Sequence, residues 1–411
     1  MSNTFNNIKD APGIIAKAAA QTLKDNLVFC STIDKADASD FDGKNGYKAG
    51  DTVYTSKPAR YVPQQTFDIT SSIQDSTEEK AALTLDVIST VGMEIDSFEF
   101  ATEVDLQSVI KRFVMPAAES IAHDVESRFI EKATDAVYNS VGTAGSNSFT
   151  VADILAARTK LNQNLTPLSD RNLLMNSVSG ALAVDARKGL FQDASAIKEQ
   201  YRNGMVGRAD GFDWYENELL NIHTNGNDVT GVAVNDAAVA EGASTLAVDG
   251  LTNTTGTVKK GQIFTIAGVY MVHPITKTTT NVLQQFVVTA DATANGSGEV
   301  TLSISPSLRA ASTGLKNVSA LPADDAALVF VGGASSALVQ NLAYQKTAFK
   351  MVSVPLIMPT KAEVAAQETV EGITVAVIRD FDILKRRMVT RLDFLGGISA
   401  VRPEWAARIT S

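Results

Sequence analysis

The sequence predicts an α+β protein of several domains, one of which is an inserted β-barrel or β-sandwich. Three observations predict this class. Six apolar residues between Leu83 and Ile95 occupy odd positions, as in a strand with one covered face. A stripe of apolar residues at i, i+4 spacing follows Pro116, as in a long amphipathic helix. From Asn225 to about Gln340 the chain becomes rich in Thr, Ala, Gly, Val and Asn and poor in charge, as in a separate β-domain.

The N-terminal stretch APGIIAKAAAQTLKDNLVF predicts an amphipathic helix. Pro12 suits its first turn, and the alanine-rich run from Ala16 to Ala20 favours helix. The stretch that follows, DKADASDFDGKNGYKAGD, is rich in Asp, Gly and Lys. We therefore expect an extended polar arm after this helix.

Two strands joined by the polar stretch DSTEEK (75–80) predict a long hairpin. The first is TVYTSKPARYVPQQTFDITSSIQ, in which Phe67, Ile69 and Ile73 share one face. The second is the alternating run from Leu83 to Ile95, with Thr84, Asp86 and Glu94 among its polar positions. A hairpin of this length cannot bury its apolar face alone, so we expect it to lie on something else, such as another chain.

Helical spacing then begins, with two helices separated by a break at Pro116. The first is VDLQSVIKRFVM. The second, PAAESIAHDVESRFIEKATDAVYNSVG, would be about 40 Å long at 1.5 Å per residue. Its apolar stripe has charged residues opposite, which is typical of a helix with one buried face. The stripe consists of Ala117, Ile121, Val125, Phe129, Ala133 and Val137.

The segments outside the β-rich middle predict a mixed helix and strand domain. Thr150 and Asp153 resemble a capping box that starts a helix over ADILAARTKLNQN. RNLLMNS predicts a short buried strand, SGALAVDARKGLF a helix, and NGMVGRADGFDWYENELL a strand fed by a tight loop. SSALVQNLAYQKTAF predicts a further helix, and GITVAVIRDFDIL and RRMVTRLDFLGGISAV predict two closing strands before the tail RPEWAARITS.

Composition and motifs argue against catalysis, metal binding and membrane insertion. No run of about 18 apolar residues is present, and MSNTFNNIKD does not resemble a secretory signal. The single cysteine, Cys30, has an apolar setting that predicts a packing residue. His123, His223 and His273 have no second His or Cys at ligand spacing, and His273 is expected to end a strand and point to solvent. We expect no catalytic, cofactor-binding or metal-binding residues.

Charge argues against a surface built for tight binding of phosphates. The net charge is −10, with the acidic residues dispersed. The densest basic run is Lys385, Arg386 and Arg387. It predicts the solvated face of a strand, and the alternative is contact with nucleic acid or with a neighbouring acidic surface. What remains is a set of projecting elements that cannot bury their own apolar faces, which is typical of a subunit of a large assembly.

Several segments, in this order, resemble the major capsid proteins of tailed bacteriophages. KAGDTVYTSKPARY resembles the segment that enters their extended loop, and NGMVGRADGFDWYENELLNIHTNG a passage of their axial domain, with Gly207 and Gly211 matching. KKGQIFTIAGVYMVHPITKTTTNVLQQFVVTA resembles the inserted β-domain of one branch, the coat proteins of short-tailed phages of the Salmonella type. LVQNLAYQKTAFKMVSVPL and RLDFLGGISAVRPEWAARI resemble the return from that insertion and the closing strand with its tail.

The resemblance implies the Hong Kong 97-type capsid fold with an inserted β-barrel domain. The domains would be the N-terminal arm (1–48), the extended loop hairpin (49–100), the peripheral domain with its spine helix (101–142), the first part of the axial domain (143–222), the inserted β-barrel (223–345) and the axial and peripheral return (346–411). In the resembled family the inserted domain aids monomer folding and supports contacts between capsomers. The candidate contact loop of this chain, NDAAVAEG (235–242), is short and nearly uncharged.

The function implied is that of a major capsid protein that self-assembles into hexamers and pentamers. They would form an icosahedral shell around double-stranded phage DNA, which the shell encloses without specific binding. Scaffolding protein and portal are the expected partners, and the chain would occupy the host cytoplasm before it enters the virion. The candidates for contact between subunits are Glu78, Glu79 and Lys80 near the hairpin tip, together with Lys385, Arg386 and Arg387.

Two alternatives compete with this interpretation. The Thr/Ala/Gly-rich middle is also typical of a secreted β-rich surface-layer protein or adhesin, although the long helix has no place in such a protein. An enzyme with an accessory β-domain is the second alternative, and it lacks a recognisable catalytic motif.

Overall fold

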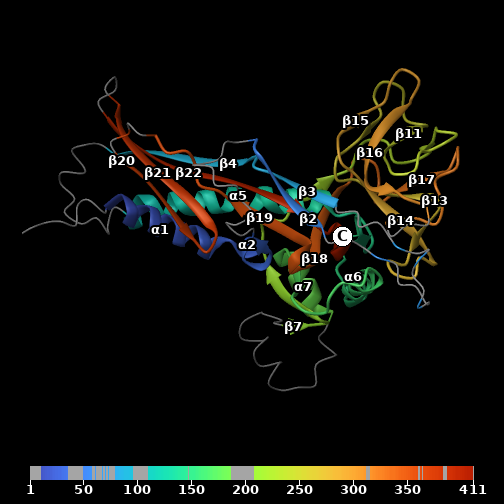
Figure 1. Cartoon of the computed structure of the whole chain (residues 1–411), viewed down its shortest axis with the longest axis horizontal. Helices are drawn as coiled ribbons and strands as arrows, with labels where there is room; N and C mark the ends of the chain where they lie inside the picture. Colours follow the sequence, from blue (N-terminus) through green and yellow to red (C-terminus); the bar gives the residue numbers. More distant parts are fainter. Residues whose placement is uncertain are drawn as a thin grey trace, which may run out of the picture. The chain divides into compact units, whose positions relative to one another are not determined.

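A computed structural model of the chain shows two compact units, each built on its own sheet (Figure 1). The structure describes residues 11–35, 50–57, 61, 67, 70, 73, 79–95, 110–146, 148–186, 208–311, 315–359, 362, 364–382 and 387–410. The first unit comprises Met1–Thr55, Lys80–Ile130 and Phe349–Ser399. The second unit comprises Ser56–Glu79, Glu131–Ala348 and Ala400–Ser411.

The first unit is organised around a sheet of six strands. The strand order is β1 (Asp34–Lys35), β19 (Phe349–Ser353), β22 (Arg387–Ala400), β21 (Ile373–Asp382) and β20 (Val364–Val370), and β4 (Val87–Ile95) also pairs with β22. The two predicted closing strands are thus confirmed as β21 and β22. Helix α1 (Ala11–Asn26) contacts β20 and β21, and the short helix α2 (Val28–Thr32) follows it. Edge-to-face ring contacts join Phe129 to Phe394 and Phe29 to Phe349 in the core.

The long helix of the first unit is α5 (Met115–Ala136), whose residues from Glu131 on belong to the second unit. Its predicted apolar stripe is buried as expected, with Ile121, Val125 and Phe129 completely enclosed. The predicted break at Pro116 is wrong, because a π-helical turn (Ile110–Val114) leads directly into α5. Pro116 therefore lies inside a continuous run of helical turns, directly after the π-helical turn, and such an irregular turn accommodates a residue that has no N–H to donate.

The predicted second strand of the hairpin is two strands with different partners. β3 (Glu79–Thr84) pairs with β2 (Thr52–Lys57), whereas β4 pairs with β22 of the same chain. The alternation itself is correct, since Leu83, Leu85 and Val87 are buried. Leu83 and Leu85 pack against side chains that include Val352 and Leu395. The expectation that another chain covers this apolar face is therefore wrong for residues 83–87, because their own chain covers it.

The second unit contains a sheet of seven strands. The order is β5 (Ser140–Val141), β23 (Ala406–Thr410), β18 (Ala337–Gln345), β6 (Arg171–Met175), β8 (Phe212–Glu216) and β7 (Arg208–Ala209), and β9 (Ile222–Thr224) pairs with β18. Helices α6 (Val151–Gln163) and α7 (Ser177–Asp185) share one apolar core with these strands. The predicted capping box is confirmed, since Thr150 and Asp153 each accept the backbone N–H of the other. Two 3-10 turns lie at Lys346–Ala348 and Pro403–Trp405.

The helix predicted over residues 335–349 is wrong, because this segment forms β18 and the start of β19. β18 is hydrogen-bonded to β6, β9 and β23, and residues 340–345 are all buried. A central strand that is covered on both faces loses the alternation that identifies a half-exposed strand. Its apolar run therefore looks like that of a buried helix.

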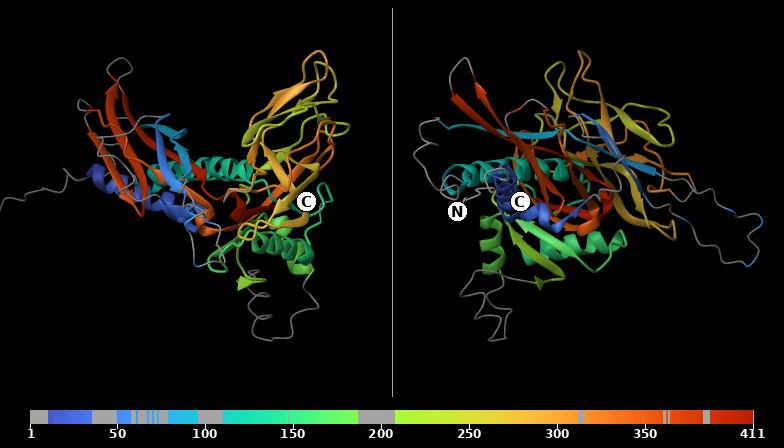
Figure 2. Two further views of the ribbon diagram at one scale, coloured as in Figure 1. Left: turned by 45° about the vertical axis from the view of Figure 1, so that its right-hand side comes forward. Right: turned by 60° about the vertical axis from the view of Figure 1, so that its left-hand side comes forward.

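The predicted β-barrel is confirmed and closes on itself (Figure 2). Its order is β10 (Ala233–Val234), β11 (Ala243–Asp249), β16 (Val300–Leu308), β14 (Thr279–Val288), β13 (Ile263–Val272) and β17 (Leu328–Phe330). Closure follows from backbone bonds between the two edges, where Val234 donates to Ala326 at 3.0 Å and Leu328 donates to Val232 at 2.9 Å. A small second sheet pairs β12 (Thr257–Val258) with β15 (Ala292–Thr293). Phe264 contacts Phe286 and Phe330 in the barrel core, with ring centroids 5.7 and 5.5 Å away.

Candidate functional site: the barrel junction and the assembly surfaces

The predicted contact residues lie largely outside the part of the chain that the structure describes. Glu78, Lys385 and Arg386 are outside it entirely. Glu79 and Lys80 begin β3 and Arg387 begins β22, and only their backbones are described. Their role in contacts between subunits therefore stays a prediction.

The candidate contact loop 235–242 uses its carboxylates within its own barrel. Glu241 accepts the backbone N–H groups of Ala310 and Ala311 at 3.0 and 3.1 Å. Asp236 accepts the N–H of Ala238 at 3.0 Å, within the loop itself. Both charges are thus engaged in fixing local backbone.

Two of the histidines lie in surroundings that do not suggest a catalytic or metal-binding role. His123 is exposed on α5. His273 follows β13, and its Nδ1 accepts the backbone N–H groups of Ile275 and Thr276 at 3.3 and 3.1 Å. The expectation that His273 points to solvent is therefore wrong, since the half-buried ring caps the turn into β14. Among the residues with described positions, no cluster of His, Cys, Asp and Glu could hold a metal ion, and no helix could span a membrane.

The third histidine, His223 on β9, is buried where the chain enters the barrel. Its side chain faces Gly261, and its Nε2 has no hydrogen-bond partner within the described residues. Burial, aided by the positive charge of Arg408, lowers the pKa of His223, and Asp135 and Asp291 oppose this only partly. The imidazole is therefore neutral at neutral pH.

The central group of this junction is Arg408, on the last strand β23. Its side chain is buried, with a relative exposure of 1%. Nε and Nη2 donate to the carbonyl oxygen of Val137 at 2.9 and 2.5 Å, and Nη1 donates to that of Gly261 at 2.7 Å. Burial lowers the pKa of Arg408 to about 10, so it remains a cation at neutral pH. One side chain thus joins the end of α5, the barrel and the closing strand.

Two further contacts join the same elements beside Arg408. Asp135 near the end of α5 forms an ion pair with Lys260 of the barrel at 3.0 Å, and the Asp135 side chain is only 11% exposed. The amide of Gln285 on β14 pairs with the backbone of Ser140 in both directions, accepting its N–H at 3.0 Å and donating to its carbonyl at 2.9 Å. The Gln285 side chain therefore satisfies both backbone groups of Ser140, as a neighbouring strand would at the edge of β5.

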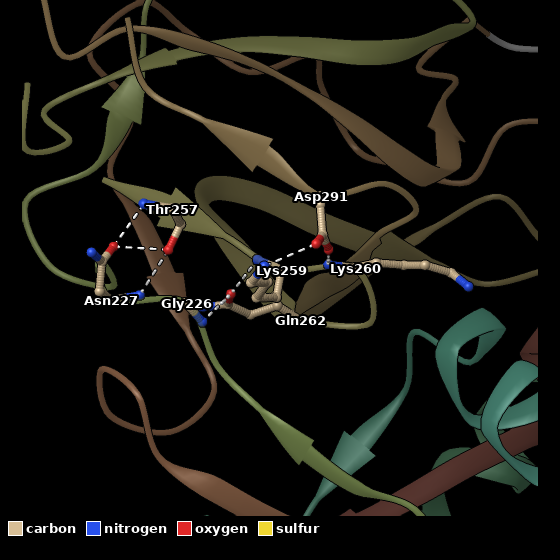
Figure 3. A network of polar contacts seen from close by, with 7 residues as sticks. All are labelled: Gly226, Asn227, Thr257, Lys259, Lys260, Gln262 and Asp291. Atoms are coloured by element: carbon tan, nitrogen blue, oxygen red, sulfur yellow. Dashed lines mark hydrogen bonds and ion pairs between the residues drawn. The ribbon is translucent and has the colours of Figure 1, made fainter. Parts of the chain in front are cut away.

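A polar network fixes the barrel strands next to the junction (Figure 3). Gln262 Oε1 accepts the N–H groups of Gly226 and Lys259, at 3.2 and 3.1 Å. Asp291 accepts the N–H of Lys260 at 2.7 Å, and Lys259 Nζ at 2.9 Å. A side chain at position 226 would place its Cβ 1.9 Å from the carbonyl oxygen of Thr257, so this close approach requires glycine.

The entry and exit of the barrel are also tied together. Asn225 donates its N–H to the carbonyl of Ser336 at 3.0 Å. Its side-chain amide donates to the carbonyls of Val331 and Gly333 at 2.9 and 3.1 Å. Asn227 and Thr257 bond each other through side chains and backbone, with the shortest contact at 2.7 Å. These groups hold a domain in place, and no local sequence pattern predicts this role for Asn225 or Arg408.

Comparison with known proteins gives a family for the chain. The family model described as "P22 coat protein - gene protein 5" matches residues 4–408. No curated protein matches the chain. The CUS-3 coat protein I-domain is 27% identical and is similar over 25% of this chain and 96% of its own, with a TM-score of 0.19. Structures from Mycobacterium phage Che8 (12% identity, 93% and 90% covered, TM-score 0.43) and of the bacteriophage PhiM1 mature capsid (11%, 91% and 90%, 0.42) are similar over most of both chains.

Proposed function

The chain belongs to the P22 coat protein family, and we propose that it builds its shell through surfaces that its own fold leaves uncovered. As a member of this family it is a major capsid protein of a tailed phage, a virion component whose copies form an icosahedral shell. The resemblance found in the sequence is confirmed, and so is the Hong Kong 97-type fold with an inserted β-barrel. The family is structural, so the chain is neither an enzyme nor a surface-layer protein or adhesin.

The observation that carries the proposal is the exposure of apolar side chains in the extended loop region. Phe67 is fully exposed, and Ile73 and Tyr54 are 77% and 64% exposed. By contrast, Leu83 and Leu85 of the same region are buried by their own chain. The uncovered part of the loop is therefore the part that gains most from lying on a neighbouring copy, at about 25 cal/mol per Å² of apolar surface removed from water.

We infer the role of each segment of the chain from its resemblance to the major capsid proteins of tailed phages. Residues 1–48 act as the arm and residues 49–100 as the loop over the adjacent subunit, with Glu78, Glu79 and Lys80 as charges at its rim. Residues 143–222 and 346–390 supply the axial domain, and the return 346–411 as a whole supplies axial and peripheral parts. Lys385, Arg386 and Arg387 are a second candidate contact, and an acidic surface of a neighbour suits their charge.

The copies are proposed to form hexamers and pentamers, with scaffolding protein and portal as further partners. The shell encloses double-stranded DNA without specific binding. The net charge of −10 supports this, because a protein that binds DNA tightly clusters Lys and Arg to replace counterions. An acidic chain leaves the packaged DNA free to move.

Electron microscopy of the purified full-length chain tests the proposal. We expect closed shells or tubular polyheads once the concentration exceeds a threshold, since many weak contacts act together. The triple variant His123→Ala, His223→Ala and His273→Ala provides a check on catalysis, and it should still assemble wherever it still folds. A chain that stays a compact monomer under all assembly conditions, with Phe67 buried against its own body, would contradict the proposal.

A further inference from the structure

The outer surface of helices α6 and α7, with the loop between α6 and β6, has few exposed charges. Between residues 150 and 186, all of them described, Asp170 and Asp185 are the charged residues that are exposed, whereas Asp153, Arg158 and Lys160 of α6 are half-buried. Five large apolar side chains are exposed there instead, and we name them the neutral strip. They are Leu155 (44%), Leu165 (44%), Leu168 (68%), Val178 (65%) and Leu182 (37%).

Helix α5 of the same chain shows the charged side chains that a solvent-exposed helix face carries in this protein. The exposed positions of α5 include Glu119, His123, Arg128 and Glu131. A surface helix normally carries charged residues opposite its buried stripe, as α5 does. The neutral strip departs from this rule on two helices at once, which is the signature of a surface that is covered by a partner.

The members of the strip lie on one side of one sheet. Ile154, Ala157 and Leu161 of α6 share a single apolar core with Ala183 of α7 and with strands β6, β8, β18 and β23. Because the two helices bury their inner faces in the same core, their outer faces point away from the same sheet. Figure 1 shows α6 and α7 together on that side of the second unit.

The loop between α6 and β6 is held rigid from beneath by a buried arginine. Arg171 is 2% exposed. Its Nε donates to the carbonyl of Pro167 at 2.7 Å, its Nη2 to that of Thr166 at 2.6 Å, and its Nη1 to Asn162 Oδ1 at 2.9 Å. Two of the three donor positions thus serve the loop that presents Leu165 and Leu168, and the third joins it to the last turn of α6.

Leu165 has the backbone conformation that ends helix α6. Its φ is +55°, in the left-handed region that leucine rarely adopts, and its side chain projects into solvent. Leu165 donates its N–H to the carbonyl of Asn162 at 3.0 Å, and Thr166 donates to that of Leu161 at 3.0 Å, so the helix end and Arg171 together fix the loop. A loop already fixed in this way loses little entropy when a partner covers it.

We propose that the neutral strip is a contact surface that a second copy of this chain covers within a ring of subunits, an inference that rests on the proposed function. Each copy has a net charge of −10, so identical copies repel wherever they meet through carboxylates. Contact is therefore most favourable where exposed charge is missing. Five partly exposed side chains are few against the roughly 20–30 residues per side of a standard interface, so the contact acts through repetition around a closed ring.

Cysteine labelling of assembled shells tests this directly, because Cys30 is the only cysteine and is completely buried. The variant Val178→Cys adds one exposed thiol within the strip. We expect a maleimide to label it at least tenfold more slowly in shells than in the unassembled chain of the same variant. Equal rates in the two states would overturn the proposal, and so would protection that appears only when a second protein is present.

A charge variant supplies an independent readout with matched controls. Val178→Glu should lower the yield of sedimenting shells at least tenfold while the melting temperature of the unassembled chain stays that of the wild type. Val178→Leu, and Ser120→Glu on the charged face of α5, are the controls and should assemble normally. If Val178→Glu gave the wild-type yield of sedimenting shells, this inference would be overturned and the proposed function would stand. Failure of the wild type to form shells would contradict the proposed function.

Discussion

Replacing Arg408 by methionine tests whether the junction holds the barrel in place. The substitution removes the charged donors from two buried carbonyl oxygens, those of Val137 and Gly261. An unsatisfied buried acceptor costs about 1–3 kcal/mol, so two cost about 2–6 kcal/mol. Methionine also removes the desolvation cost of the guanidinium, which opposes this loss. We therefore expect a net loss of about 3 kcal/mol in the free energy of unfolding.

Urea unfolding of the unassembled chain, followed by tryptophan fluorescence, measures this loss. The two tryptophans, Trp214 and Trp405, both belong to the second unit, so the signal reports on the unit that contains the junction. In a thermal melt the same loss corresponds to a decrease of roughly 6–12 °C, at about 2–4 °C per kcal/mol for a unit of this size. Arg208→Met is the matched control, because the Arg208 side chain is 63% exposed and lies 3.7 Å from Asp213. The control should change the free energy by under about 0.5 kcal/mol. Equal midpoints and slopes for Arg408→Met and the wild type would refute the reasoning.

Three further substitutions have outcomes that follow from the structure. Phe286→Ala removes a ring that is stacked on Phe264 in the barrel core and should cost about 3–5 kcal/mol, measured by urea unfolding, and a loss below about 1 kcal/mol would contradict this packing. Glu126→Ala removes the buried carboxylate that accepts the N–H of Phe29 at 2.5 Å, so we expect a loss of about 1–3 kcal/mol and faster hydrogen exchange at that amide. His223→Phe should remove part of the acid sensitivity. The folded pKa of His223 is lowered, so the wild type loses stability as the pH falls below about 6.5, by up to about 1.4 kcal/mol per pH unit. Parallel curves of stability against pH for the two proteins would contradict that assignment.

Local sequence patterns predicted the elements that have one covered face. The alternation from Leu83 and the stripe through Phe129 both correspond to buried residues, because one side of each element faces a core. The same reasoning misassigned β18, since a strand that is covered on both faces carries no alternation. The strand pairing of β4 with β22 was also missed, because nothing near Val87 in the sequence indicates a partner about 300 residues away.

The groups that fix the junction could not be predicted for a related reason. The acceptors of Arg408 lie 271 and 147 residues earlier in the chain. A lone arginine in the segment AARI gives only a weak signal, namely a charge within an otherwise apolar strand. The left-handed backbone of Leu165 has no local signal at all, because neither glycine nor asparagine occupies that position.

Buried hydrogen bonds and exposed apolar contacts differ in how much rotation they tolerate, and this difference matters for shell closure. In the proposed shell one chain serves in rings of five and of six, so the geometry between neighbours would differ from ring to ring. Hydrogen bonds such as those of Arg408 and Arg171 depend steeply on distance and angle, and they are confined to the interior of the second unit. Apolar contact is non-directional and tolerates a small rotation of one surface over another. A chain that keeps its polar bonds inside and meets its neighbours through the neutral strip can therefore change ring size without breaking a buried hydrogen bond.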